Sequence, residues 1–199
     1  MSGCWASASD PLLSDYHDQE WGRPVVDEQA LFERLCLEGF QSGLSWRTVL
    51  AKRPAFREVF AGFDPAAVAA FDAADVERLM SDARIIRNRR KIEAVLTNAR
   101  LVLAMDGGFA PLVWSYEPAE RPAPAPLVDL PATVPESVAL SKHLRRAGFA
   151  FVGPTTVYAG MQACGLVNDH LADCPYRPAV AEARAALVRP APTIGPDSG

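Results

Sequence analysis

The chain has 199 residues, of which 49% are hydrophobic and 22% are charged, and its formal net charge is −4. These values favour one globular domain with a sizeable core, and they exclude a globally disordered chain. The N-terminus has no basic region followed by an apolar run, and no window holds the roughly 20 apolar residues of a membrane span, so we expect a cytoplasmic protein without membrane contact.

Two capping patterns lie near the start of the chain. Asp10-Pro11 joins an N-cap residue to a proline at the first helical position, which predicts a helix that runs to about Glu20. Asp27 predicts a second N-cap, and the apolar residues after it recur every three or four positions as far as Phe40. The second helix is therefore expected to bury one face.

A turn and a third helical run follow. The segment QSGLSW (41–46) contains Gly43 and is expected to interrupt the helical pattern. The next run begins at Trp46. Pro54 is expected to break it, because proline removes a backbone donor and clashes with the preceding turn, and the helix is expected to resume as far as Phe60.

Three more helices are predicted between residues 64 and 108. Asp64-Pro65 repeats the pattern of a cap and a proline, and residues 72–80 are expected to form another short helix. Asn88 is expected to cap the longest helix of the protein. Gly107-Gly108 is the expected end of that helix, because glycine tolerates the left-handed conformation found there.

The second half of the chain begins with an irregular stretch. Residues 117–135 are rich in proline and are expected to form a connector without regular structure. Helices are predicted over 137–148 and 154–164, and the apolar residues 149–153 between them are too few and too isolated to predict a sheet. At most one further helix is expected after Tyr176.

The distribution of charge leaves the partner open. A negative net charge argues against DNA, because phosphate contacts come from Lys and Arg. Two local clusters are nevertheless basic: RIIRNRRK (84–91), and the group formed by Lys142, His143, Arg145 and Arg146. A solvated helix end is the simpler interpretation of each cluster, and contact with a nucleic-acid backbone is the alternative.

Residues with metal-ligand chemistry lie near both ends of the chain: Cys4, His17, His170 and Cys174. The last two are four residues apart, which places them on one face if that segment is helical. Two cysteines and two histidines form a closed tetrahedral zinc set, which would be structural and would join the two ends of the chain. On spacing alone, four unrelated residues are the slightly better interpretation. Cys36 and Cys164 lie on apolar faces and are interpreted as core residues.

A family resemblance rests on four long segments: DPLLSDYHDQEWG (10–22), LFERLCLEGFQSGLSWRTVLAKR (31–53), IIRNRRKIEAVLTNAR (85–100) and FVGPTTVYAGMQACGLVNDH (151–170). In these segments the chain resembles the DNA-3-methyladenine glycosylase I family of the helix-hairpin-helix superfamily, over roughly residues 1–177. The resemblance implies an all-α fold of the helix-hairpin-helix type, with zinc bound at the four residues named above. We expect one glycosylase domain over 1–187, with two lobes that share one core, and a disordered tail over 188–199.

The resemblance also implies an activity and a pocket. The expected enzyme is a DNA repair glycosylase that flips 3-methyladenine out of double-stranded DNA and hydrolyses its N-glycosidic bond without strand cleavage. Glu38 is the expected catalytic residue, because its carboxylate would accept hydrogen bonds from the base edge and favour a cationic base. The aromatic residues expected to stack on the base are Tyr16, Trp46, Trp21 and Trp5. Without the resemblance, a surface glutamate and ordinary core aromatics are the simpler interpretations.

Contacts with DNA are expected from the turn after Glu38. The turn residues concerned are Gln41, Gly43 and Leu44, and a small apolar wedge there would fill the gap left by an extruded base. The alternative is a plain connecting turn with Leu44 packed inward.

A second DNA contact is expected at residues 81–92, the predicted hairpin element, where Arg87, Asn88 and Arg89 would hold a phosphate. Arg84 stands where members of the family usually have glycine. If that position requires a positive φ, the arginine is strained or the hairpin is altered.

Two further departures concern the pocket. Trp5 follows Cys4 directly, whereas family members usually have one residue between the two, and Leu13 replaces an aromatic residue that is common there. The matched pocket segments contain no lysine that would form a Schiff base, which favours simple hydrolysis. Asp106 is the nearest aspartate after the long helix, but it belongs to the expected helix end and is given no role.

The sequence is compatible with two other functions. One is a zinc-stabilised protein that binds DNA without catalysis, and the other is a helical protein unrelated to DNA that uses its cysteines for redox regulation. Whichever function holds, the glycosylase included, we expect a monomer. The shared presence of Glu38, Tyr16 and Trp46 favours the enzyme.

Overall fold

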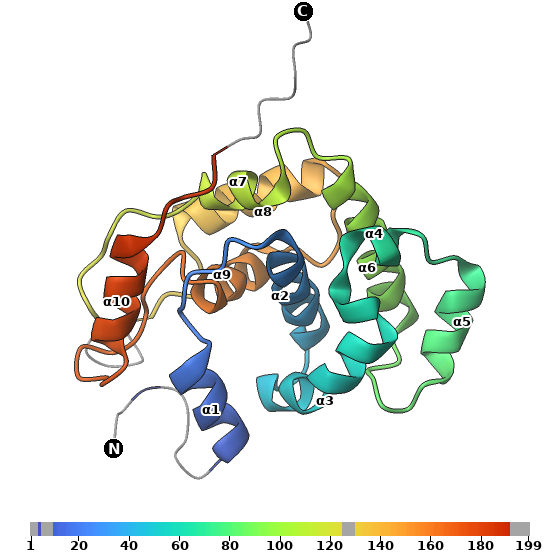
Figure 1. The fold of residues 1–199 in the computed structure, drawn as a ribbon, viewed down its shortest axis with the longest axis horizontal. Helices are drawn as coiled ribbons and strands as arrows, with labels where there is room; N and C mark the ends of the chain where they lie inside the picture. The colour runs from blue at the N-terminus through green and yellow to red at the C-terminus, as the bar shows by residue number, and fades with distance from the viewer. Residues whose placement is uncertain (1–3, 5–9, 125–129, 192–199) are drawn as a thin grey trace, which may run out of the picture.

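The computed structural model describes residue 4 and residues 10–124 and 130–191, and the regular elements within these ranges are all helices (Figure 1). They are α1 (Pro11–Gln19), α2 (Glu28–Gln41), α3 (Trp46–Val59), the 3₁₀ helix η1 (Ala61–Phe63), α4 (Pro65–Ala69), α5 (Ala73–Ser81), α6 (Arg89–Leu103), α7 (Phe109–Trp114), α8 (Pro135–Arg146), α9 (Pro154–Ala163) and α10 (Arg177–Ala186). The predicted all-helical fold class is confirmed.

The predicted N-caps form as expected. The Asp10 carboxylate accepts hydrogen bonds from the backbone at the start of α1, and Asp27 accepts one at 2.8 Å from the third residue of α2. Asn88 accepts from the Lys91 amide at 3.2 Å and opens α6, the longest helix of the described part of the chain. Each side chain satisfies a backbone donor that the first helical turn leaves without a partner.

The expected break at Pro54 is wrong, because α3 runs without interruption from Trp46 to Val59. Proline removes one helical hydrogen bond, whose acceptor would be the carbonyl of Leu50. The buried face nevertheless continues on both sides of the proline and consists of Val49, Leu50, Arg53, Phe56 and Val59. Packing of this face therefore holds the helix together despite the lost bond.

The helix α7 was missed, because Gly107-Gly108 was interpreted only as an ending. Both glycines have a positive φ, 81° and 91°, and Gly108 is also the N-cap of α7. Glycine has no side chain to cap with, and the carboxylate of Glu28 on α2 accepts from the Ala110 amide at 2.9 Å instead. The start of α8 also differs from the prediction, at Pro135 rather than Ser137.

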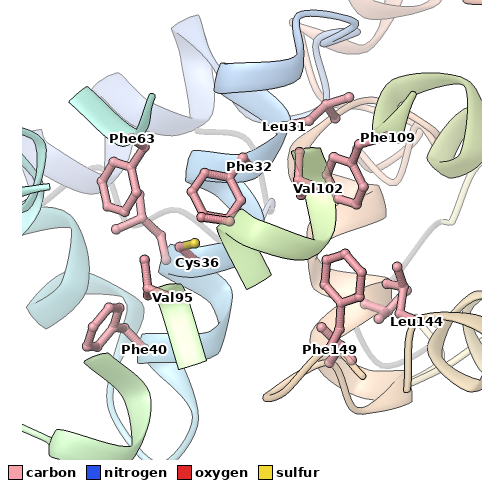
Figure 2. Close-up of a cluster of buried hydrophobic side chains, with 14 of the residues drawn as sticks. Leu31, Phe32, Cys36, Phe40, Phe63, Val95, Val102, Phe109, Leu144 and Phe149 are labelled. Atoms are coloured by element: carbon pink, nitrogen blue, oxygen red, sulfur yellow. The ribbon is translucent and has the colours of Figure 1, made fainter. Parts of the chain in front are cut away.

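The core surrounds α2, against which α9, α3 and α6 pack (Figure 1). In Figure 2 the side chain of Phe32 lies in the middle, with Phe63 and Phe40 on one side and Phe109 and Phe149 on the other. One continuous cluster of buried side chains thus runs from η1 to α8. Because α2 is held on several sides, the polar side chains near its C-terminal end have fixed positions.

The boundaries of the domain stay predictions. Residues 188–191 lie outside any helix, and residues 192–199 of the expected tail lie outside the described residues. Within the part of the chain that is described, no helix is both long and apolar enough to cross a bilayer.

Candidate base-binding pocket and metal site

A cavity of about 270 Å³ opens where α1, α2, α3 and α9 meet. It is lined by Tyr16, Trp21, Glu38, Gln41, Trp46, Leu130, Ala159 and Gln162. Four of these residues were predicted as pocket residues and Gln41 as a DNA contact, and the fold brings all five to the same cavity. The remaining three come from the connector before α8 and from α9. The predicted pocket residue Trp5 lies outside the described residues.

Aromatic rings form one side of the cavity. The rings of Tyr16 and Trp46 lie 5.3 Å apart between centroids, with their planes at 51°. Leu13 packs against the same cluster, so it contributes apolar surface behind the rings. The Trp46 Nε1 is buried and has no hydrogen-bond partner among the described residues. Flat apolar faces with a few polar atoms are typical of pockets that bind a planar ligand.

Glu38 is the only acidic residue that lines this cavity within the described chain. The residue is 5% exposed, and no hydrogen bond or ion pair joins its carboxyl group to another described residue. Burial raises the pKa of Glu38 to about 8, against the smaller opposing effect of the Arg34 guanidinium one helical turn earlier. A carboxyl group held in this way gains a large electrostatic benefit from any ligand that brings a positive charge or N–H donors.

An ionic network that joins α2 and α3 to the end of α1, and that the sequence did not reveal, reaches the pocket residue Tyr16. Arg34 pairs with Glu20 at 2.6 Å, and its guanidinium lies 5.6 Å from the centre of the Tyr16 ring. Arg53 on α3 pairs with Glu20 at 2.8 Å and with Glu33 at 2.6 Å. The network therefore ties the end of α1 to α2 and α3, and it holds Tyr16 at the cavity.

The predicted metal ligands come together beside the last turn of α1, which contains His17. The ligand atoms of Cys4, His17 and Cys174 all lie within 4.8 Å of one another, and all three residues are buried. The Cys174 Sγ is 3.8 Å from the His17 Nε2. Segments about 150 residues apart in the sequence therefore meet at one point, as the zinc hypothesis requires.

The fourth predicted ligand, His170, lies beside these three residues. Its ring lies 4.9 Å from the ring of His17 between centroids, and its Nε2 is buried without a hydrogen-bond partner among the described residues. Burial, followed by the nearby His17, lowers the pKa of His170 to about 4, which keeps its ring neutral. The segment from His170 to Cys174 is a turn, so the expectation of a helix there is wrong, although the two side chains still lie near His17.

The second ring nitrogen of each histidine has an oxygen partner. The His17 Nδ1 lies 2.8 Å from Asp18, and the His170 Nδ1 lies 3.0 Å from the Asn168 side-chain oxygen. An oxygen acceptor at Nδ1 leaves the proton there and the lone pair at Nε2, which is the arrangement seen around zinc-bound histidines. Two thiols and two such Nε2 atoms fit a tetrahedral zinc ion.

Trp21 joins the metal-ligand group to the cavity. Its ring stacks on His17 at 5.9 Å and meets the ring of His170 edge-on at 4.7 Å, while it also lines the cavity. Tyr16 precedes His17 in the chain. Trp21 therefore connects the two histidines directly to the aromatic side of the cavity.

The turn after α2 connects Gln41 to Trp46, both of which line the cavity. Gly43 has a φ of 80°, and the Leu44 side chain is 40% exposed, which contradicts the alternative in which it packs inward. The Lys91 Nζ donates to the carbonyls of Phe40 at 2.8 Å and Ser42 at 2.6 Å. This buried lysine caps the end of α2, and it was not identified from the sequence.

The predicted hairpin element joins α5 to α6. The Lys52 Nζ on α3 donates to the backbone carbonyls of Ala83 and Arg84 at 3.3 and 2.8 Å. Arg84 is not among the residues with a positive φ, so the strain anticipated for a non-glycine residue is absent. Its guanidinium pairs with Asp82 at 2.7 Å and with Glu58 at 2.8 Å.

The basic cluster at this hairpin is partly neutralised by its own neighbours. Arg89 pairs with Glu77 at 2.8 Å and lies 3.9 Å from Glu93. Arg87 and Arg90 are exposed, and neither forms an ion pair within the described ranges. Among the three residues predicted to contact phosphate here, Arg87 is therefore the most available cation.

Known proteins resemble the chain along nearly its whole length. The methyladenine glycosylase family profile matches residues 5–177. The DNA-3-methyladenine glycosylase 1 of Escherichia coli (strain K12) is 49% identical over 180 residues, which span 87% of this chain and 96% of that protein. A crystal structure of 3-methyladenine DNA glycosylase I superposes with a TM-score of 0.82 at 49% identity, covering 86% of this chain and 96% of the other. A single-residue variant of a 3-methyladenine DNA glycosylase I in complex with 3-methyladenine superposes with the same TM-score at 38% identity, covering 86% and 95%. The chain therefore belongs to the methyladenine glycosylase family.

Proposed function

We propose that this protein is a monofunctional DNA glycosylase, which hydrolyses the N-glycosidic bond of 3-methyladenine in alkylated double-stranded DNA. The observation that carries the proposal is the cavity that Glu38 lines together with the aromatic residues Tyr16, Trp21 and Trp46. The family membership and a relative bound to 3-methyladenine support the choice of base.

The residues of the cavity account for recognition of a flipped base. An extruded nucleotide places its base between the aromatic rings, where stacking contributes about 1–3 kcal/mol. The base edge then meets Glu38, whose buried carboxylate accepts N–H donors and is stabilised by a cationic ring. The same charge stabilises neutral adenine much less, so the pocket selects alkylated bases.

The reaction itself requires little acid catalysis. A 3-methylated adenine already carries a positive charge and is a good leaving group, so its departure leaves an oxocarbenium-like sugar that water attacks. No lysine lines the cavity within the described residues. A covalent Schiff base, which would lead to strand cleavage, therefore has no nucleophile here.

Zinc is the proposed cofactor, bound at Cys4, His17, His170 and Cys174. All four positions would be filled by protein, so the ion is structural and has no site for a reacting water. It supplies a crosslink between the N-terminal segment and the turn after α9. Through Trp21 and Tyr16, the crosslink also orders a wall of the base pocket.

The exposed surface beside the cavity fits duplex DNA. Leu44 projects from the turn after α2, next to Gln41 at the cavity wall, and fills the gap in the duplex. The hairpin before α6, with Arg87, Asn88 and Arg89, holds the phosphate backbone, and one protein molecule acts on each lesion.

A redox function has no support from the buried thiols outside the metal group. Burial raises the pKa of Cys164 to about 12 and the pKa of Cys36 well above its usual range. Both thiols therefore stay protonated and unreactive. An assay for release of the free base distinguishes glycosylase activity from DNA binding without catalysis.

Release of free base is the direct test. Duplex DNA treated with a methylating agent is incubated with the protein, and the released bases are identified by chromatography and mass spectrometry. We expect free 3-methyladenine together with intact abasic strands on a denaturing gel. Binding of methylated DNA without base release would overturn the proposed reaction, and strand breaks at the abasic sites would overturn simple hydrolysis.

The wedge role of Leu44 predicts a difference between duplex and single-stranded DNA. Leu44→Ala is expected to lower kcat/KM on duplex substrate about tenfold, because the unstacked gap is no longer filled, and to change it little on single-stranded substrate. Leu103→Ala is the matched control, since Leu103 is 55% exposed at the far end of α6. An equal loss on both substrates would rule out the wedge.

A further inference from the structure

Gln162 is a cavity residue to which the chemistry above gives no role. It lies on α9, lines the same cavity as Glu38, and is partly exposed to it. Its Nε2 donates a hydrogen bond to Asp169 at 2.9 Å. No described residue donates to its side-chain oxygen, Oε1.

Asp169 fixes the orientation of this amide. Its carboxylate is 5% exposed, pairs with Arg121 at 3.0 Å and accepts from the Tyr158 hydroxyl at 2.5 Å. An ionised carboxylate only accepts hydrogen bonds, so the NH₂ end of Gln162 must face it. A rotation of the amide by 180° would place two acceptors against each other. The Oε1 is therefore held in place as an acceptor that is still available.

We propose that Gln162, oriented by Asp169, is a specificity-determining residue that accepts a hydrogen bond from the exocyclic amino group of the base. This inference rests on the proposed function of the pocket. Glu38 and Gln162 then form a wall with two acceptors, which matches the two N–H donors of an adenine amino group. Guanine carries the acceptor O6 at that position. The wall therefore favours 3-methyladenine over 3-methylguanine.

The magnitude of this selection follows from buried polar groups. A pocket that hydrogen-bonds one substrate rejects an analogue that leaves its polar groups without partners, often by a factor of about 100 or more. Asp169 acts as a positioning residue, since it holds the amide and does not itself line the cavity. Its replacement should change which base is preferred rather than only lower the rate.

Two variants test the two roles, with kcat/KM for release of 3-methyladenine and of 3-methylguanine as the readout. Gln162→Met keeps the side-chain length without the acceptor, and is expected to lower the 3-methyladenine value about tenfold while the 3-methylguanine value stays level. Asp169→Asn can donate to the Gln162 oxygen, so the amide can turn and present its N–H to O6. The preference ratio is then expected to fall about tenfold or more.

Gln41→Met is the matched control, because Gln41 lines the same cavity without an aspartate partner. It is expected to affect both substrates alike. Binding of the free bases, followed by quenching of tryptophan fluorescence, gives a readout that does not depend on turnover. It should show the same loss of preference in Gln162→Met. Zinc content and melting temperature establish that each variant is folded.

The outcomes separate this inference from the proposed function. A wild-type protein that releases neither base contradicts the function itself. A wild-type protein that releases 3-methyladenine, together with a Gln162→Met variant whose preference ratio in turnover and in binding is unchanged, contradicts the role of Gln162 alone.

Discussion

Replacing Glu38 by glutamine is expected to remove most base release and, at pH 8, to make the protein more stable. Glutamine has the same shape but cannot carry the negative charge that stabilises a cationic base, so we expect kcat/KM to fall at least about 100-fold. The stability should rise because a buried carboxyl group without a hydrogen-bond partner among the described residues is replaced by a neutral amide.

The gain in stability of Glu38→Gln over the wild type is expected to increase with pH. The pKa of Glu38 is about 8 in the folded protein, above the value of 4.5 for the unfolded chain. The neutral carboxyl group contributes stability that is fully present below pH 4.5 and is lost as the pH rises through 8. The melting temperatures of the variant and the wild type should therefore be similar near pH 4.5. Above pH 8 the unfolding free energy of the variant should exceed that of the wild type by on the order of 5 kcal/mol.

Ionisation of Glu38 should increase the activity of the wild-type protein, although it decreases the stability. The ionised form of Glu38 binds the cationic base, so kcat/KM of the wild type is expected to rise with pH and to level off near pH 8, whereas Glu38→Gln should show no such rise. Glu182→Gln, on the exposed face of α10, is the control and should alter neither activity nor stability. A Glu38→Gln variant that turned over normally would contradict the assignment of this residue.

The elements of the fold that the sequence predicted well are those set by local chemistry. Asp10, Asp27 and Asn88 each satisfy backbone donors within three residues, so their effect can be recognised from adjacent positions. Pro54 shows where this approach fails, because the cost of a proline is local but the packing that offsets it comes from the whole buried face of α3. The same holds for α7, whose capping acceptor is Glu28, more than 80 residues away.

Some residues of the site could likewise be predicted from the sequence, and others could not. Resemblance placed Glu38, Tyr16 and Trp46 together, and all three line one cavity of the structure. Gln162 and its partner Asp169 were not singled out, because their role depends on an amide orientation that only the folded contacts define. The ionic network of Arg34, Glu20 and Arg53 was missed for a related reason, since charged helix residues far apart in sequence are usually solvated.

The predicted metal ligands lie near one another, although one premise of that prediction is wrong. His170 and Cys174 were expected on one helical face, but the segment is a turn that bends both side chains toward His17. Spacing alone could not distinguish the two geometries. What the structure adds is the pair of oxygen partners, Asp18 and Asn168, which direct the two Nε2 atoms inward.

Removal of the metal is expected to destabilise the protein and to weaken base binding together. The purified protein should contain about one zinc ion per chain, and Cys174→Ser should lose it, because one thiolate of the closed set is gone. The lost crosslink between chain ends should lower the melting temperature by about 10 °C or more. Since Trp21 rests on His17 and His170, the affinity for free 3-methyladenine should also fall.

Cys164→Ala is the matched control for this experiment, because Cys164 is buried in the core and lies outside the metal-ligand group. It is expected to retain zinc and to keep the affinity for the base, even if the small void lowers its melting temperature. Metal analysis, thermal unfolding and tryptophan fluorescence titration measure the three properties separately. Full zinc occupancy in Cys174→Ser would refute the ligand assignment. A metal-free protein that binds 3-methyladenine as tightly as the wild type would instead show that the pocket wall is ordered by the helices alone, through the contacts of Arg34 with Glu20 and Tyr16.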